Sequence, residues 1–179
     1  MVKVFNNVLD NSHIQLMEEI MLDSKHFPWY FAHHNLDYGH SQKSRSNKFL
    51  FTHNFFTKLN DPPYSNFFYL VEPIVDYIKK QCDNTESILR IKSNLYTNQH
   101  MNIETEPHID QGEYGEKECL IGLFNVIGCN GGTAIGGKTY PSVRNQLLLF
   151  DNVPHHGITQ SDTQARVCIN FNFKITAEN

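Results

Sequence analysis

The chain has 179 residues, of which 40% are hydrophobic and 12% aromatic. A chain of this length and composition can bury one sizeable hydrophobic core but is too short to favour two. We therefore expect a single domain over residues 1–179. It has no run of about 18 apolar residues and no signal-peptide pattern at its N-terminus, which predicts a soluble protein of the cytoplasm with no membrane partner. The net charge of −4 gives no electrostatic reason to expect binding to nucleic acid, although a local basic groove would still allow it.

The N-terminal part of the chain, to about residue 85, predicts helices. Residues 12–15 have the form of a capping box, and the apolar residues that follow at helical spacing are Met17, Ile20 and Met21. Residues 65–81 carry an apolar face made of Phe68, Val71, Val75 and Ile78, which predicts a second helix, kinked at Pro73. Residues 27–56 show no clear period and favour irregular structure or short edge strands. Their aromatic stretch 26–38 would either form a lid over a site or simply pack.

From about residue 86 to residue 176 the sequence predicts strands. Short β-branched and aromatic runs are separated by Gly, Asn, Asp and Pro clusters, and they cover residues 88–97, 119–127, 132–135, 146–150 and 166–175. Helices followed by strands indicate an α+β fold, and strands without intervening helices favour an antiparallel jelly roll. The four cysteines, at 82, 119, 129 and 168, show no CxxC spacing, so we expect reduced structural thiols.

Two of the predicted strands have one polar and one apolar face. In the last strand the apolar face carries Val167, Ile169, Phe171 and Phe173, and the polar face carries Arg166, Cys168, Asn170 and Asn172. In the strand at 88–97 the polar face carries Arg90, Lys92, Asn94 and Tyr96, opposite Leu89, Ile91 and Leu95. These rows could line a polar cavity, in which Arg166 would bind a carboxylate and Arg90 and Lys92 would meet an acidic group of the substrate. A structural ion pair of Arg166, or a strand with one wet face, explains the same residues.

Histidines and a carboxylate form a candidate metal site. His108 and Asp110 stand at positions i and i+2, so on an extended segment both side chains leave from the same face. A third ligand can come from the adjacent pair His155 and His156, which follows the apolar run 147–150. Two histidines and one carboxylate are the ligands of a non-haem Fe(II) centre with open positions. Neighbours on a strand face opposite ways, so only one of the pair can serve. Solvated histidines in a turn are the alternative.

The ordered set Asn94-x-Tyr96, His108-x-Asp110, His155-x-Gly157 and Arg166 resembles the Fe(II)/2-oxoglutarate-dependent dioxygenase superfamily over residues 88–173. Within that superfamily the chain is similar to small phage and bacterial members of the prolyl-hydroxylase-like group. The resemblance implies a double-stranded β-helix, the distorted jelly roll, over residues 86–176, with the N-terminal helices packed outside it. For a phage protein, the cytoplasm would be that of the host.

The resemblance also implies the role of each site residue. His108, Asp110 and His155 (or His156) would bind Fe(II), Arg166 would bind the 5-carboxylate of 2-oxoglutarate, and Tyr96 and Asn94 would hydrogen-bond this cosubstrate. The implied reaction uses O2, with ascorbate as a reductant, and hydroxylates a protein side chain, a peptide or a small metabolite with release of succinate and CO2. A nucleobase demethylase is the nearest variant. A jelly-roll binding or structural module without catalysis is the alternative function.

Overall fold

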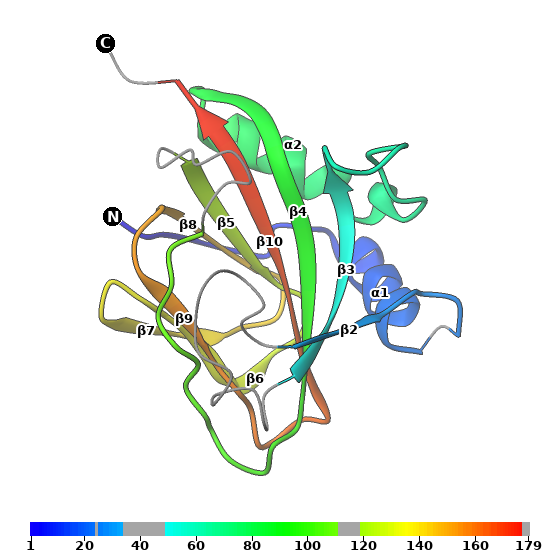
Figure 1. Cartoon of the computed structure of the whole chain (residues 1–179), viewed down its shortest axis with the longest axis vertical. Coiled ribbons are helices and arrows are strands. Elements are labelled where there is room, and N and C mark those ends of the chain that lie inside the picture. The colour runs from blue at the N-terminus through cyan, green and yellow to red at the C-terminus, as the bar shows by residue number, and fades with distance from the viewer. Residues whose placement is uncertain (24, 34–48, 111–118, 177–179) are drawn as a thin grey trace.

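The computed structural model describes residues 1–23, 25–33, 49–110 and 119–176. Seven strands form a main antiparallel sheet in the order β1-β8-β5-β10-β4-β3-β2, and three strands form a smaller sheet in the order β7-β6-β9 (Figure 1). The main sheet consists of β1 (Lys3–Asn6), β2 (Tyr30–His33), β3 (Phe49–Thr57), β4 (Thr85–Thr97), β5 (Cys119–Asn125), β8 (Gln146–Asp151) and β10 (Ala165–Ile175). The smaller sheet consists of β6 (Cys129–Ile135), β7 (Lys138–Ser142) and β9 (His155–Ile158).

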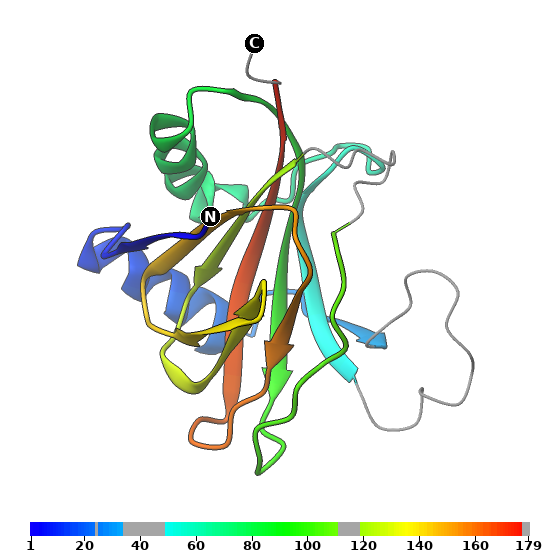
Figure 2. The same cartoon turned by 90° about the vertical axis from the view of Figure 1, so that its left-hand side faces the viewer.

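Two α-helices cover the outer face of the main sheet, and Figure 2 shows both on the same side of it. Helix α1 (Asn11–Glu18) begins at the N-cap Asp10, whose carboxylate accepts a hydrogen bond from the backbone N–H of His13 at 2.8 Å, and a π-helical turn, η1 (Glu19–Asp23), continues it. The cap therefore lies two residues before Ser12. Within the described residues, no helix has the length and the apolar character needed to span a bilayer.

The second predicted helix needs a correction at Pro73. A 3-10 turn, η3 (Phe68–Leu70), precedes helix α2 (Glu72–Gln81), and Pro73 stands in the first turn of α2 instead of kinking a longer helix. Proline is tolerated there because the first N–H groups of a helix have no intrahelical partner. Ile74, Val75 and Ile78 are buried against the sheet.

The strands of the C-terminal half lie where the sequence predicts them, but the N-terminal part is not only helical. It adds β1, which pairs with β8, and β3, which pairs with β4 and carries β2 at the edge. A short edge strand within residues 27–56 was expected, whereas the nine-residue β3 was not. Its run of phenylalanines lacks strict alternation because a bulge lies between Asn54 and Phe56. The short strands β7 and β9 were also not predicted.

The apolar face of the last strand lies where the alternation places it. Val167, Ile169, Phe171 and Phe173 are fully buried in the cluster beneath the helices. Ile91 and Leu95 of β4 join this cluster, as predicted, but Leu89 does not: it packs in the second cluster with residues such as Ile121 and Phe150. The β4–β10 register steps from Arg90 to Ile88 and skips Leu89, so a bulge turns this side chain to the other face.

The space between the two sheets has an apolar half and a polar half. Ile121 and Leu123 of β5 and Leu148 and Phe150 of β8 form the apolar half. Toward β10, β4 and β3 the inner face carries the polar rows instead. Of the proposed lid, residues 34–38 lie outside the described residues. Trp29 packs, because its ring lies 5.0 Å from that of Phe27 and its indole N–H donates to the Met21 carbonyl at 2.8 Å.

Candidate active site

Three side chains from two separate segments meet in the polar half of the interior. One ligand atom each of His108, Asp110 and His155 lies within 4.8 Å of the other two. Asp110 Oδ1 is 3.7 Å from His108 Nε2 and 4.0 Å from His155 Nε2. Asp110 and His155 are buried, whereas the His108 side chain is 51% exposed, so the group is open to the outside on the His108 side.

Backbone pairing brings the two segments together. Residues 103–108 run beside β9 and form antiparallel bridges at Glu104 with Ile158 and at His108 with His155. The N–H of His108 donates to the His155 carbonyl at 3.0 Å, and the reverse hydrogen bond is 2.9 Å. This reciprocal pair sets the two imidazoles side by side, with ring centroids 4.6 Å apart.

In both histidines, a hydrogen bond at Nδ1 leaves Nε2 as the nitrogen that can bind a metal ion together with Asp110. His155 Nδ1 lies 2.8 Å from the Val153 carbonyl oxygen, and His108 Nδ1 lies 3.3 Å from that of Glu106. Because a carbonyl oxygen only accepts, Nδ1 must be the donor in both rings. The Nε2 lone pairs are therefore free to bind a cation, which is the usual arrangement of metal-binding histidines.

Asp110 is held as a carboxylate with one oxygen directed at the imidazoles. Its Oδ2 accepts a hydrogen bond from Asn172 Nδ2 at 2.8 Å, and Arg90 Nη2 lies 3.8 Å from Oδ1. Burial by itself would raise the pKa of Asp110, but the charge of Arg90, the nearby His155 and the Asn172 hydrogen bond together hold the pKa below its ordinary value. Burial lowers the pKa of His155, against the attraction of Asp110, so the ring stays neutral and able to bind a metal.

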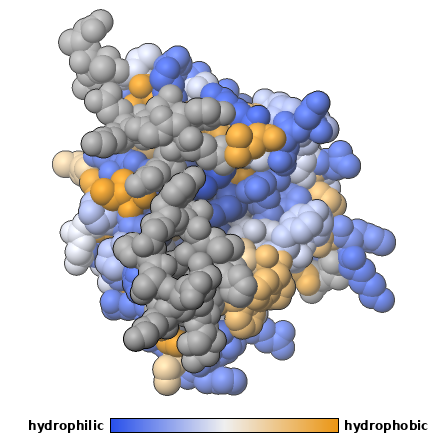
Figure 3. Space-filling view, in the orientation of Figure 1, coloured by the Kyte–Doolittle hydropathy of each residue, from blue (hydrophilic) through white to orange (hydrophobic). Residues whose placement is uncertain are grey.

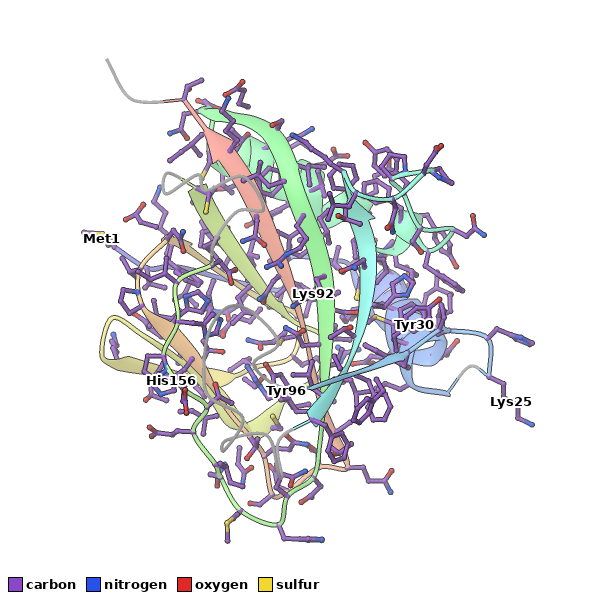
Figure 4. All side chains as sticks on the ribbon, viewed as in Figure 1. Met1, Lys25, Tyr30, Lys92, Tyr96 and His156 are labelled. Atoms are coloured by element: carbon purple, nitrogen blue, oxygen red, sulfur yellow. The ribbon has the colours of Figure 1, made fainter. Side chains whose placement is uncertain are left out.

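The structure separates the two candidate histidines. His155 faces Asp110 and His108, whereas His156 points away and places Nε2 3.4 Å from Glu104 Oε2. Figure 4 shows His156 on β9, away from the labelled residues of β4. The alternation of side chains along β9 accounts for the difference.

Arg166 lies deep in the same interior and is 1% exposed. Its Nη2 donates to Thr133 Oγ1 at 2.8 Å and its Nε to Ser142 Oγ at 3.4 Å, while its guanidinium stands 5.2 Å from the ring centre of Tyr96. Among the residues that the structure describes, no carboxylate lies within 4.0 Å of this guanidinium. A buried cation whose described partners are hydroxyl groups and an aromatic ring is costly and calls for an anion.

Gly157 leaves room next to this guanidinium. A Cβ atom built at Gly157 would lie 3.4 Å from the Tyr96 hydroxyl and 3.5 Å from Arg166 Nη1, so a side chain there would occupy the space that both groups face. Burial raises the pKa of Tyr96, and its phenol therefore stays a neutral donor. Asn94 lies on the same inner face, opposite Cys168, and is buried.

Sequence reasoning missed several residues that support the site. Thr133 and Ser142 hold Arg166, Asn152 Nδ2 donates to the Asp110 carbonyl at 2.6 Å, and Thr105 Oγ1 accepts from the N–H of Gly157 at 3.0 Å. Short polar side chains in strands and turns have no distinctive spacing, so the sequence held no signal for them. Asn172 and Arg90 did lie in the predicted polar rows, but their contacts with Asp110 depend on how segments distant in sequence meet.

The residues present fit a metal ion and an anionic cosubstrate. Two neutral imidazole nitrogens and one carboxylate oxygen form a donor set that suits Fe(II) and leaves coordination positions open. The guanidinium of Arg166 and the phenol of Tyr96 both lie next to Gly157, where they could donate to an anionic group.

Comparisons with known proteins bear on the fold. No family model and no curated protein matches the sequence. Among solved structures, the chain is similar to the non-heme alpha-ketoglutarate-dependent epimerase SnoN of nogalamycin biosynthesis (TM-score 0.65, 9% identity, covering 97% of this chain and 76% of that one). It is also similar to the viral collagen prolyl hydroxylase of Paramecium bursaria Chlorella virus-1 in its 2-oxoglutarate complex (TM-score 0.62, 7% identity, covering 97% of this chain and 96% of that one). A third similar structure is a prolyl hydroxylase from Trichoplax adhaerens in complex with a hypoxia-inducible factor peptide (TM-score 0.63, 15% identity, covering 97% of this chain and 83% of that one).

These similarities establish the fold. The chain folds as the double-stranded β-helix of the Fe(II)/2-oxoglutarate-dependent oxygenases, with its helices on the outside, and the resemblance found in its sequence is confirmed at this level.

Proposed function

We propose that the protein is an Fe(II)- and 2-oxoglutarate-dependent oxygenase that hydroxylates a protein side chain, a peptide or a small metabolite. His108, Asp110 and His155 would bind Fe(II), and Arg166 would bind the 5-carboxylate of 2-oxoglutarate, with Tyr96 donating a hydrogen bond to it and Asn94 lining the cosubstrate site. The observation that carries the proposal is the buried guanidinium of Arg166 in the same interior as the three metal-binding side chains. A structural metal site does not require it.

The surroundings of Arg166 support the proposal more strongly than its positive charge does. An arginine that served only stability would pair with an acid, and among the described residues none lies within ion-pair distance. Its guanidinium instead faces the gap at Gly157, together with the Tyr96 hydroxyl. A carboxylate entering this gap would receive charge-assisted hydrogen bonds in a site from which water is largely excluded.

The residues of the chain have three tasks in the proposed reaction. The triad holds the metal from one side, Arg166 and Tyr96 fix the cosubstrate at its far end, and the apolar half of the interior keeps bulk water away. Iron, 2-oxoglutarate and O2 supply the oxidising chemistry, and the products are succinate, CO2 and the oxidised substrate. SnoN is an epimerase, so the fold also serves outcomes other than hydroxylation.

Succinate formation tests this proposal. The full chain would be incubated with Fe(II), 2-oxoglutarate and O2, with ascorbate to keep the iron reduced, and succinate would be quantified. We expect slow turnover without a primary substrate, and its complete loss in Asp110→Ala, because this change removes the only carboxylate of the metal-binding group. Asp76→Ala is the matched control, since Asp76 is exposed on α2.

Two results would contradict the enzyme assignment. If the wild-type chain binds Fe(II) but forms no succinate, the protein is better described as a non-catalytic jelly-roll binding module. If Asp110→Ala forms succinate as fast as the wild type does, the reaction does not depend on this site.

A further inference from the structure

A band of polar side chains crosses the inner face of the main sheet beside the triad. Residues directly opposite each other on antiparallel strands share a face. Lys92 on β4 stands between Asn54 on β3 and Asn170 on β10, and Arg90 stands opposite Asn172. We call the four residues Arg90, Lys92, Asn54 and Asn170 the basic row. Figure 4 shows Lys92 and Tyr96 on β4, and Figure 3 shows hydrophilic residues near the middle of the same view.

Arg90 would have a different electrostatic environment once a metal binds. Its Nη2 is 3.8 Å from Asp110 Oδ1, the same oxygen that faces both imidazoles. A divalent cation bound at that oxygen would take up most of its negative charge and would repel the guanidinium. The Arg90 side chain is 19% exposed, so it is too buried for water to solvate it fully. In the metal-bound protein, Arg90 is therefore ready to bind another anion.

Lys92 adds a second positive charge on the same face. Two strand positions from Arg90 correspond to about 7 Å, which lets both side chains reach one ligand. Lys92 stands directly opposite Asn170, whose side chain is buried on the inner face of β10, so the strand alternation places Lys92 on that face as well. Arg166 lies at the other end of the sheet face, opposite Tyr96, so the basic row is separate from the cosubstrate anchor.

Asn170 supplies an independent sign of an incomplete site. It is 9% exposed, and its side-chain oxygen is enclosed without a hydrogen-bond partner among the described residues. Buried polar atoms nearly always have a partner, so an unpaired one on this face indicates a group that the described residues do not provide. An amide can turn over to present either its oxygen or its nitrogen to that group.

The basic row also borders a pocket. A cavity of about 420 Å³ lies at the edge of β3, and its lining includes Thr52 and Asn54, the residues opposite Asn94 and Lys92. Tyr30, Tyr64 and other uncharged side chains make up the rest of the lining that the structure describes. Among the described residues, Lys92 of the basic row carries a positive charge directly opposite Asn54 of this lining.

We infer that the primary substrate carries an anionic group, a carboxylate or a phosphate, which the basic row binds beside the metal. This inference rests on the proposed function and specifies its substrate class. The cosubstrate brings two negative charges, as many as the positive charges of the metal ion. Its far carboxylate would be bound by Arg166. Arg90 and Lys92 then give the space left for the substrate a positive potential, which favours anionic molecules and disfavours their neutral analogues.

Three small probes with one scaffold, each with its α-carboxyl group blocked as an amide, test the inference: the α-amides of N-acetyl-aspartate, N-acetyl-asparagine and N-acetyl-phosphoserine. The full chain would be loaded with Mn(II), saturated with 2-oxoglutarate and titrated with each probe, and the paramagnetic relaxation of the probe protons would report binding near the metal. We expect the wild type to bind at least one anionic probe about tenfold more tightly than the neutral one, the difference between a charge-assisted and a neutral hydrogen bond. Which of the two anions binds better would show whether the group is a carboxylate or a phosphate.

Variants of Lys92 distinguish a substrate site from a general effect of charge. Lys92→Met should abolish the preference for the anion, Lys92→Arg should retain it, and Lys80→Gln, at an exposed position of α2, should not change it. Calorimetry with 2-oxoglutarate is the second readout. If Lys92→Met weakens 2-oxoglutarate binding as strongly as Arg166→Met does, the basic row belongs to the cosubstrate site and the inference is wrong.

Failure of the inference can be told apart from failure of the proposed function. If Mn(II) and 2-oxoglutarate bind but the wild type does not prefer an anionic probe, only the substrate inference fails. If neither Mn(II) nor 2-oxoglutarate binds, the proposed function itself fails.

Discussion

The two faces of β10 differ sharply in their chemistry. Toward the helices, Val167, Ile169, Phe171 and Phe173 are fully buried among other apolar side chains. Toward the smaller sheet, the same strand presents Arg166, Cys168, Asn170 and Asn172, which are also buried. One strand thus separates an apolar core from a polar interior, and burial alone does not distinguish the two.

The difference shows that only one of these faces contributes mainly to stability. Apolar burial stabilises the fold in proportion to the area removed from water. Among the described residues, the guanidinium on the polar face has no carboxylate within ion-pair distance, and the side-chain oxygens of Asn170 and Asn172 lack partners, all of which cost stability. Such a face is retained when a ligand needs it. The comparison therefore predicts opposite consequences for substitutions on the two sides of one strand.

The largest effect is expected on the helix-covered face. Phe171→Ala should lower the free energy of unfolding by about 3–5 kcal/mol, because it removes a buried ring and leaves a cavity beneath α2. Denaturant unfolding measures the change, and Leu59→Ala, at a position that is 69% exposed, should cost less than about 0.5 kcal/mol. A loss below about 1 kcal/mol for Phe171→Ala would show that the stability lies elsewhere.

On the polar face, Arg166→Met should separate stability from binding. It should weaken 2-oxoglutarate binding about 100-fold, the loss of two charge-assisted hydrogen bonds, and leave the affinity for Mn(II) close to that of the wild type. The free energy of unfolding should stay within about 1 kcal/mol or increase, because a buried unpaired cation is replaced by an apolar side chain of similar length.

Calorimetry and denaturant unfolding provide both readouts for Arg166→Met. The control is Arg144→Met, which removes an exposed arginine bound to Glu18 and should leave 2-oxoglutarate binding unchanged. A large loss of stability in Arg166→Met, with binding retained, would reverse the contrast between the two faces.

The smallest effect concerns a polar residue on the apolar face. His53 is buried among aromatic rings, and its two ring nitrogens contact the Pro28 carbonyl oxygen and the Ser65 hydroxyl. Burial lowers the pKa of His53, although the hydrogen bond with Pro28 opposes this. Below about pH 6.5 the unfolded chain takes up a proton that the folded protein resists, so stability is present above this pH and is lost as the pH falls.

Thermal unfolding at pH 7.5 and pH 5.5 measures this contribution. His53→Gln should show a smaller acid-induced fall in Tm than the wild type does, and the exposed control His100→Gln should behave like the wild type. The fall should not vanish in His53→Gln, because the pKa of His155 is also lowered by burial. Equal falls in all three proteins would mean that His53 is not the neutral, buried group described above.

Much of the fold could be predicted where side chains alternate regularly. The two faces of β10 followed directly from its sequence, as did the positions of the C-terminal strands. The errors fall where an extra residue or a tertiary contact interferes: the bulge that turns Leu89, the bulge within β3, and Pro73, which begins α2 instead of bending it. Local pattern cannot reveal a bulge, because the extra residue is defined only by the neighbouring strand.

The sequence by itself determined which side chains of a strand lie together, because alternation is a local property of the extended backbone. It therefore set Arg166, Asn170 and Asn172 on one face, and His155 opposite His156. Only the tertiary structure decided what these faces meet: that His108 pairs with His155, that Asn172 reaches Asp110, and that Arg166 donates to the hydroxyl groups of Thr133 and Ser142. These contacts join residues from 24 to 62 positions apart, and only the packing of the two sheets brings them together.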